Sequence, residues 1–259
     1  MNHHILLWIF SVSLSAVSHA QTIESFNETG DDNTVLFRAD PIYSADGVDP
    51  SGGNLFGNEL FCNGFVVAEV FKFGDVITND QSGDGNFLFG GTLNTAASDF
   101  TGLVWGNLTP ELVEPGISYV FSFYLTNLNE AMSNLAIIQP FANGQPLGAG
   151  VSAVGSFQDG KDSQWQRFEF FWESNDQTAV SFDLQNVLVS GNGNDFGLDT
   201  IELTKVGDIN CDGEIDLLDV APFVSVLTGG NLTIKADINQ DGVVDLLDVA
   251  PFVELLTGG

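Results

Sequence analysis

Apolar and polar residues alternate along much of the first 205 positions of the chain. The alternation is clearest over residues 119–125, where every second residue is aromatic or leucine, and it recurs over 168–173, 180–185 and 201–204. A period of two is typical of half-buried strands, and the clusters of Gly, Asn and Asp between the runs are typical of turns. The pattern predicts a mainly β domain over residues 21–205, built as a sandwich or a barrel.

The pattern changes after residue 205, where an internal repeat begins. Residues 208–230 and 237–259 are closely similar in sequence, at an offset of 29 residues. In each repeat the apolar residues after Asp219 or Asp248 recur at helical spacing and end at a Gly pair. The repeats therefore predict two short helices with these aspartates as N-caps, in a small helical domain over residues 206–259.

Each repeat opens with a loop of twelve positions that is rich in oxygen ligands. Side-chain oxygens fall at positions 1, 3, 5, 9 and 12, Gly falls at position 6 where the chain must turn, and position 7 can offer its backbone carbonyl. Calcium takes six to eight hard oxygen ligands, and this EF-hand-type spacing wraps them around one ion. The alternative is a pair of acidic turns without metal. The predicted ligands are Asp208, Asn210, Asp212, Glu214, Asp216 and Asp219 for one ion, and Asp237, Asn239, Asp241, Val243, Asp245 and Asp248 for the second.

The charge balance and the histidine positions exclude several classes of function. The chain has 35 Asp and Glu against 6 Lys and Arg, a formal net charge of −29, so nucleic acid and anionic membrane surfaces are not expected partners. With 44% hydrophobic residues the chain is nevertheless expected to fold. All three histidines lie before residue 20, which excludes Ser-His-Asp and Cys-His catalysis in the remainder.

The first twenty residues have the layout of a secretory signal peptide. An apolar run from Ile5 to Phe10 extends through Val12 to Val17. Ser18 and Ala20 then place small residues at the two positions that a signal peptidase reads, which would make Gln21 the first mature residue. We therefore expect a secreted or cell-surface protein. Its cysteines, Cys62 and Cys211, lie far apart in the sequence, and we expect free thiols, although a disulfide between them stays open.

The repeats resemble the type I dockerin family over residues 207–259. They share with it an Asp at position 12 of each loop and the lack of a helix before the first loop. The resemblance implies that the tail binds two calcium ions through the ligands named above and docks onto a cohesin-like domain. Positions 10 and 11 matter for cohesin choice in the family, and here they are Leu217, Leu218, Leu246 and Leu247. The alternatives are that these leucines belong to the core, and that the tail is a calcium-stapled cap without a partner.

The first domain resembles the jelly-roll domains related to carbohydrate-binding module families 4 and 9, over about residues 54–204. The resemblance lies in segments such as Asn86–Gly90, Val104–Asn107, Pro115–Phe123 and Asn194–Ile201. It implies a two-sheet jelly roll that binds polysaccharide and holds a third calcium ion partly through Asp199, whose alternative role is that of a turn residue or strand-entry cap. Sugar would bind on exposed aromatic residues. The candidates are Tyr124 and Trp172, with Trp105 and Trp165 behind them, each with the alternative of a core position.

We therefore expect a secreted, non-catalytic, calcium-binding protein that binds carbohydrate and docks through its tail, in polysaccharide breakdown or surface attachment. One alternative is a glycoside hydrolase on a jelly-roll scaffold. Its carboxylate pair would be Glu169 and Glu173, which lie about 13 Å apart along a strand, wider than such pairs need. The other alternative is a structural or adhesive surface protein.

Overall fold

The computed structural model describes residues 102–127, 135–154, 165–188 and 196–258, together with the strand backbones at 21–24, 37–38, 65–68, 70–73, 76–79 and 87–90. The expected signal peptide over residues 1–20 and Cys62 lie outside the described residues. Within the described ranges, no helix has both the length and the apolar character that a membrane crossing requires.

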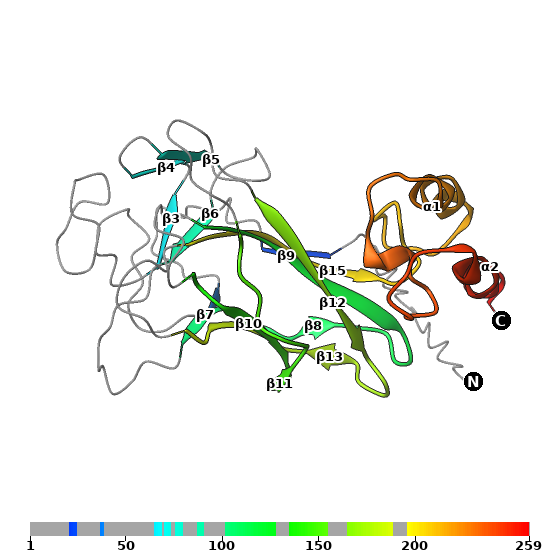
Figure 1. Ribbon diagram of the computed structural model, residues 1–259. Helices are drawn as coiled ribbons and strands as arrows, with labels where there is room; N and C mark the ends of the chain where they lie inside the picture. The colour runs from blue at the N-terminus through cyan, green and yellow to red at the C-terminus, as the bar shows by residue number, and fades with distance from the viewer. Residues whose placement is uncertain are drawn as a thin grey trace, which may run out of the picture.

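Two antiparallel sheets form the first part of the chain, which we call the sandwich (Figure 1). One sheet has the order β12-β9-β15-β6-β3, with β1 also pairing to β15, and the other has the order β11-β10-β14-β7-β2. Two smaller sheets pair β13 with β8 and β4 with β5. The strands are β1 Gln21–Glu24, β2 Phe37–Arg38, β3 Phe65–Ala68, β4 Val70–Phe73, β5 Val76–Asn79, β6 Phe87–Gly90, β7 Leu103–Asn107, β8 Glu111–Leu112, β9 Ser118–Asn127, β10 Ile138–Ala142, β11 Gln145–Pro146, β12 Gln166–Glu173, β13 Ala179–Val180, β14 Phe182–Asn186 and β15 Phe196–Lys205.

The core of the sandwich lies between the two large sheets. Phe121 of β9 stacks on Phe182 of β14, with ring centroids 4.3 Å apart, and both side chains are fully buried. Trp172 of β12 meets the same Phe182 edge-on at 5.8 Å. Alternate residues of β9 and β12 point into this core, as a half-buried strand requires. The prediction of a mainly β fold with antiparallel strands is confirmed.

The tail, residues 206–258, contains the two short helices that the repeats predict. They are α1 Val220–Leu227 and α2 Val249–Thr257, and the 3₁₀ turns η1 Leu217–Asp219, η2 Ile234–Ala236 and η3 Leu246–Asp248 accompany them. Phe223 and Phe252 stack across the helices with centroids 4.2 Å apart and form the centre of a second, smaller core. Repetition of the sequence thus produces a pair of like elements that bury the same residue against each other.

Asp219 and Asp248 stand at the N-cap positions of α1 and α2, as the repeats predict, but the capping bonds come from other residues. Asp219 and Asp248 make no side-chain capping bond. Instead Asp216 and Asp245 cap η1 and η3, because each 3₁₀ turn continues into the following helix. The chain therefore starts to coil three residues earlier than the apolar spacing suggests.

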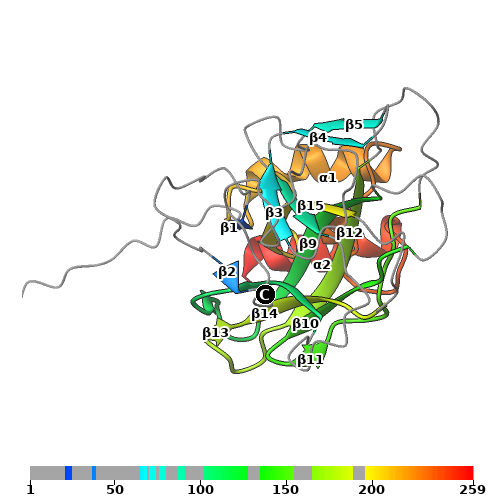
Figure 2. The ribbon, with the colours of Figure 1, turned by 90° about the vertical axis from the view of Figure 1, so that its left-hand side faces the viewer.

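The tail follows the last strand of the sandwich directly and packs against its outer face. Val206 donates its N–H to the Ser118 carbonyl at 2.9 Å, and Gly207 donates to the Lys235 carbonyl at 3.0 Å. Figure 2 views the molecule from the opposite end of the sandwich, with α1 and α2 beyond the sheets. The Val206 bond therefore joins the first residue of the tail to strand β9 of the sandwich.

Candidate functional site

The first acidic loop, residues 208–219, is organised by side chains that accept backbone N–H groups. Asp208, at position 1, accepts from the N–H groups of Asp212 at 3.1 Å and Gly213 at 2.9 Å. The second loop, residues 237–248, repeats this arrangement. There Asp237 accepts from Asp241 at 3.1 Å and from Gly242 at 2.9 Å. Both loops therefore fold around their first aspartate in the same way.

The loop positions that follow repeat the same pattern of bonds. Asn210 and Asp212 accept from backbone N–H groups two residues further on, at 2.8 and 3.0 Å. Gly213 has φ +89°, a conformation that glycine adopts readily and that residues with a Cβ rarely do. The equivalents in the second loop are Asn239 at 2.9 Å, Asp241 at 2.9 Å and Gly242 at φ +89°.

The last position of each loop is a buried aspartate. Asp219 is fully buried and accepts from the N–H groups of Asn210 at 2.9 Å and Asp216 at 3.0 Å, so that it ties the end of the loop to its start. Asp216, at position 9, also caps the 3₁₀ turn η1 with its side chain. The second loop again matches, with Asp248 accepting from Asn239 at 3.1 Å and from Asp245 at 2.8 Å.

Burying these carboxylates places negative charges close together. Burial raises the pKa of Asp208, the Gly213 N–H lowers it, and the neighbouring charge of Asp219 raises it further. Asp237 shows the same direction, with burial as the largest cause and Asp248 among the charges that raise its pKa. Lys235 lowers the pKa of Asp208 in part, but burial outweighs it, so the ionised form of each first aspartate is disfavoured.

The donor atoms of the loops are all hard oxygens. An ionised carboxylate has about four acceptor sites, of which Asp208 uses two for backbone N–H groups, so acceptor capacity is left for a cation. Among the described residues, no three acidic, cysteine or histidine side chains converge as a closed cluster. An EF-hand-type site also draws on amide and backbone carbonyl oxygens, here those of Asn210 and Glu214 or of Asn239 and Val243.

Asp199 lies in β15 at a local irregularity. It is fully buried, its Oδ1 accepts from the Thr200 N–H at 2.7 Å, and Thr200 has φ +48°. The pairing register with β9 shifts between Asp199 and Glu202. The geometry accounts for Asp199 as a residue that stabilises a bulge, and a third calcium ion stays a prediction.

The four leucines of loop positions 10 and 11 lie on the surface. Their exposed fractions match between the repeats: 79% and 64% for Leu217 and Leu218, and 79% and 65% for Leu246 and Leu247. These side chains are therefore not part of the tail core. They form two equivalent apolar pairs beside the two acidic loops.

Two of the aromatic residues considered for sugar binding are core residues. Trp105 is 1% exposed and Trp172 is 8% exposed, and both lie in the cluster between the sheets, so their interpretation as a binding platform is wrong. Tyr124 lies on the outer face of β9, and the Arg167 guanidinium sits over its ring at 5.7 Å from the centroid. Trp165 is half-buried at the start of β12.

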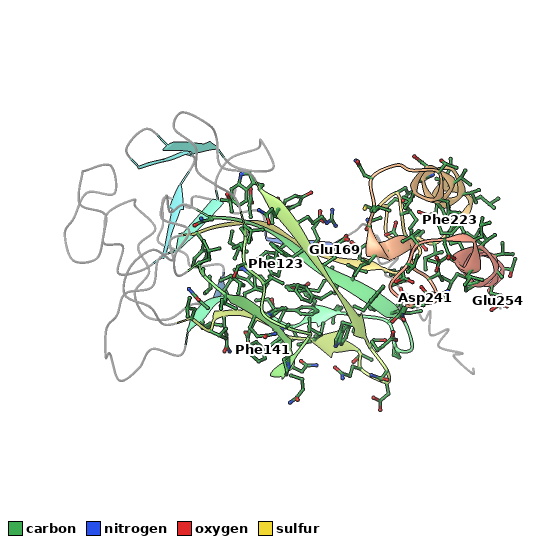
Figure 3. All side chains as sticks on the ribbon, viewed as in Figure 1. Phe123, Phe141, Glu169, Phe223, Asp241 and Glu254 are labelled. Carbon is green, nitrogen blue, oxygen red and sulfur yellow. The ribbon has the colours of Figure 1, made fainter. Side chains whose placement is uncertain are left out.

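The outer face of the second sheet carries a polar surface with one aromatic residue, which the sequence analysis missed. Phe141 on β10 lies opposite Asp183 on β14, and Asp183 in turn lies opposite Gly106 on β7. Gln139 and Gln185 form the neighbouring cross-strand pair, and all four side chains are half-buried. Figure 3 shows Phe141 on this sheet, away from the core residue Phe123. The period of two over β10, Ile138–Ala142, is the sequence signal that could have identified this face.

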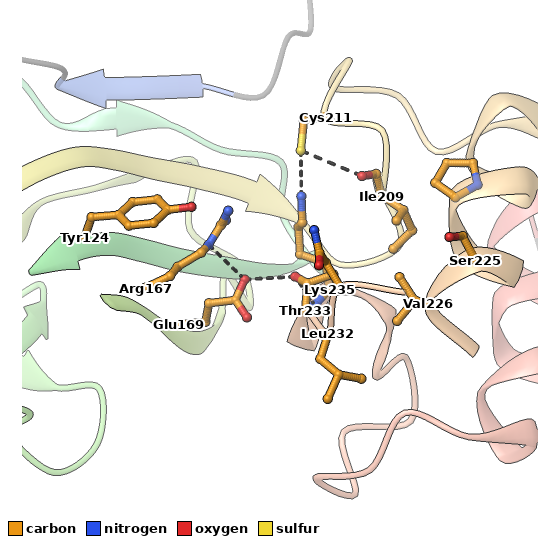
Figure 4. Close-up of a pocket in the computed structure, with 12 residues that line it drawn as sticks. Tyr124, Arg167, Glu169, Ile209, Cys211, Ser225, Val226, Leu232, Thr233 and Lys235 are labelled. Atoms are coloured by element: carbon orange, nitrogen blue, oxygen red, sulfur yellow. Dashed lines mark hydrogen bonds and ion pairs between the residues drawn. The ribbon is translucent and has the colours of Figure 1, made fainter. Parts of the chain in front are cut away.

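Glu169 and Glu173 both make contacts at the junction between the sandwich and the tail. Glu169 accepts from the Thr233 hydroxyl at 2.8 Å and from the Ile234 N–H at 3.1 Å (Figure 4). Glu173 accepts from the Ser118 hydroxyl at 2.6 Å and from the Gln240 amide at 3.0 Å. These contacts account for both carboxylates as attachment points for the tail.

Comparisons with known proteins find only weak similarity to solved structures. No protein-family model matches the chain, and no curated protein matches it. Solved structures that it resembles include the xylan-binding CBM22-1 domain of Xyn10C from Paenibacillus barcinonensis, at 13% identity and a TM-score of 0.33, covering 57% of this chain and 90% of that one. A cyclase from Fischerella sp. TAU aligns at 12% identity and a TM-score of 0.40, covering 70% and 93%. The α-L-arabinofuranosidase MgGH51 aligns at 11% identity and a TM-score of 0.41, and the alignment covers 83% of this chain and 30% of that one.

These similar structures thus include a carbohydrate-binding module, a cyclase and a glycoside hydrolase. These TM-scores are too low to assign either a fold family or an activity to this chain.

The junction contacts of Glu169 lead to a testable prediction. Glu169→Ala leaves the Ile234 N–H and the Thr233 hydroxyl without their acceptor and removes one of the two carboxylates at Arg167, so we expect the free energy of unfolding to fall by about 1–3 kcal/mol. Urea denaturation monitored by tryptophan fluorescence measures this change. Asp176→Ala, at an exposed turn residue, is the control. A Glu169→Ala variant as stable as the control would contradict the proposed attachment.

Proposed function

We propose that this chain is a secreted, non-catalytic, calcium-binding protein that binds polysaccharide with its sandwich and docks onto a partner protein with its tail. The observation that carries the proposal is the pair of acidic loops, which fold around their first and last aspartates through the same backbone bonds. In this proposal the tail is a dockerin-like domain, and the sandwich is a jelly roll like those of carbohydrate-binding modules.

Two calcium ions in the tail are the first element of the proposal. The loops offer hard oxygen atoms at EF-hand-type spacing, and burial together with like charge destabilises their ionised carboxylates when no cation is present. Bound calcium would offset this repulsion and so stabilise the tail. When bound, the ion supplies structural charge compensation, and the protein residues set the shape of each loop.

Calcium titration of variants tests this element. We expect the chain to bind two ions, and Asp208→Asn or Asp237→Asn to remove one each, because each substitution neutralises position 1 of one loop. Glu254→Gln, which neutralises a carboxylate of the tail outside both loops, is the control. Isothermal titration calorimetry counts the sites, and excess chelator should abolish the helical circular dichroism of the tail. A wild-type chain that takes up no calcium, or keeps its helical signal in chelator, would contradict the proposal.

Polysaccharide binding by the outer face of the second sheet is the next element. Phe141 offers an aromatic surface for the C–H face of a sugar ring, and Gln139, Asp183 and Gln185 surround it with planar polar groups. Gly106 opposite Asp183 leaves the strand β7 without a side chain at that point. An aromatic residue amid amides and a carboxylate suits an uncharged polymer of sugars.

Affinity electrophoresis of the full chain in gels that contain xylan, β-glucan, mannan or polygalacturonate tests this face. We expect one or more of the neutral polymers to retard the wild type, and Phe141→Ala to weaken that binding about tenfold through loss of the aromatic contact. Leu112→Ala, at an 80% exposed residue on β8, is the control. Lack of retardation by every polymer would favour a structural or adhesive function instead.

Docking through the leucine pairs is the third element. Leu217, Leu218, Leu246 and Leu247 are exposed beside the loops, where an apolar surface of this kind marks an interaction site. The partner that the dockerin resemblance implies is a cohesin-like domain. The calcium loops position both pairs, so docking is expected to require calcium.

Substitution of all four leucines by serine tests the docking surface. We expect binding to purified type I cohesin domains, measured by surface plasmon resonance in calcium, to weaken at least about tenfold, because the variant removes the exposed apolar contact area. Leu112→Ser, at an 80% exposed apolar residue of the sandwich outside the tail, is the control. If wild type binds no cohesin domain and pull-downs from the secreted fraction recover no cohesin-like protein, the tail is a structural cap.

A further inference from the structure

A cavity of about 640 Å³ lies at the junction of the sandwich and the tail (Figure 4). Its size falls within the range of roughly 300–1,000 Å³ that small-molecule sites occupy. Both parts of the chain line it, so neither part forms the cavity alone. The sandwich contributes Tyr124, Arg167 and Glu169, and the polar residues that the tail contributes include Ser225, Asn231 and Thr233.

The sandwich wall is held in place by its own contacts. Arg167 Nε forms an ion pair with Glu169 Oε1 at 3.2 Å, and its Nη2 donates to Glu202 Oε2 at 3.1 Å. Glu169 in turn accepts from the tail at Thr233 and Ile234. The Tyr124 ring, the Arg167 guanidinium and the Glu169 carboxylate thus form a preorganised polar wall, which lowers the entropy cost of binding a ligand.

The tail wall presents polar groups that no protein contact engages. The Ser225 hydroxyl and the Asn231 amide belong to exposed residues, and in the described ranges neither side chain has a hydrogen-bond partner. Pro222, Val226 and Ile209 supply apolar surface between them. The cavity therefore combines apolar surface with hydrogen-bond donors and acceptors.

The charges around the cavity argue against an anionic ligand. Arg167 and Lys235 line it, but Arg167 already contacts both Glu169 and Glu202. The chain as a whole carries a net charge of −29, so it repels polyanions. A ligand with apolar C–H faces, many hydroxyl groups and no charge matches this lining.

We propose that this junction pocket is a second binding site for an uncharged sugar, separate from the Phe141 face. The proposal rests on the polysaccharide-binding function proposed above. Because the tail forms one wall of the pocket, the pocket is complete only when the tail is folded. The folded tail in turn depends on the calcium ions proposed above. Sugar binding at the junction thus depends on calcium without any contact between sugar and ion.

Calorimetric titration of the full chain with hexasaccharides of xylan, β-glucan and mannan, in calcium, tests the pocket. The Phe141→Ala variant, checked for folding by circular dichroism, removes the contribution of the sheet face. Within that background, Ser225→Ala with Asn231→Ala removes two hydrogen bonds from the tail wall, and we expect about tenfold weaker binding. Glu254→Ala is the matched control, because Glu254 occupies in α2 the position that Ser225 occupies in α1. The control should leave the affinity unchanged.

The outcomes separate this inference from the function on which it rests. Two results would overturn the proposed sugar site in the pocket. One is equal sugar affinity for the variant with Ser225→Ala and Asn231→Ala and for the Glu254→Ala control. The other is loss of all sugar binding in the Phe141→Ala variant alone. In both cases polysaccharide binding by the sheet face would still stand. A wild-type chain that binds none of the three hexasaccharides would overturn the proposed function and the pocket together.

Discussion

The pleat of strands β9 and β12 is the constraint on which the arrangement of the molecule depends. Because successive side chains of a strand point to opposite sides, Phe121 and Trp172 enter the core while Arg167 and Glu169 face the tail. A shift of one residue in the pairing of these strands would exchange the two sets. The pairing of β9 with β12 therefore determines both the stability of the sandwich and the position at which the tail packs.

The sequence was informative where a pattern is local. A period of two identified the strands around residues 119–125 and 168–173, and the repeat identified two short helices. Periodicity gives the phase of a strand but not which face is covered, so Trp172 was considered both as a platform and as core. Phe141 was missed because β10 is short and carries a single aromatic residue.

The contacts that join the two parts could not be predicted, because they link residues far apart in the sequence. Glu169 and Ile234 are separated by 65 residues, and no local spacing signals their meeting. The sequence also did not show which aspartate makes the capping bond. Asp216 and Asp219 both lie at the start of the coil, and only the 3₁₀ turn of the backbone separates their roles. The loops themselves were predictable as a motif, since their ligand spacing is a property of the sequence alone.

The direct passage from β15 into the first acidic loop affects how far the molecule can reach. Multidomain proteins with flexible linkers let one module search a volume around the other, and linker length sets the local concentration of that search. Here Val206 and Gly207 are hydrogen-bonded to Ser118 and Lys235, so no such tether exists between the parts. If the tail binds a partner and the sandwich binds a polymer, as proposed, the partner would lie at a fixed angle and distance from that polymer. Its footprint on that polymer would be a single patch, and movement to the next patch would require release and rebinding of the whole assembly.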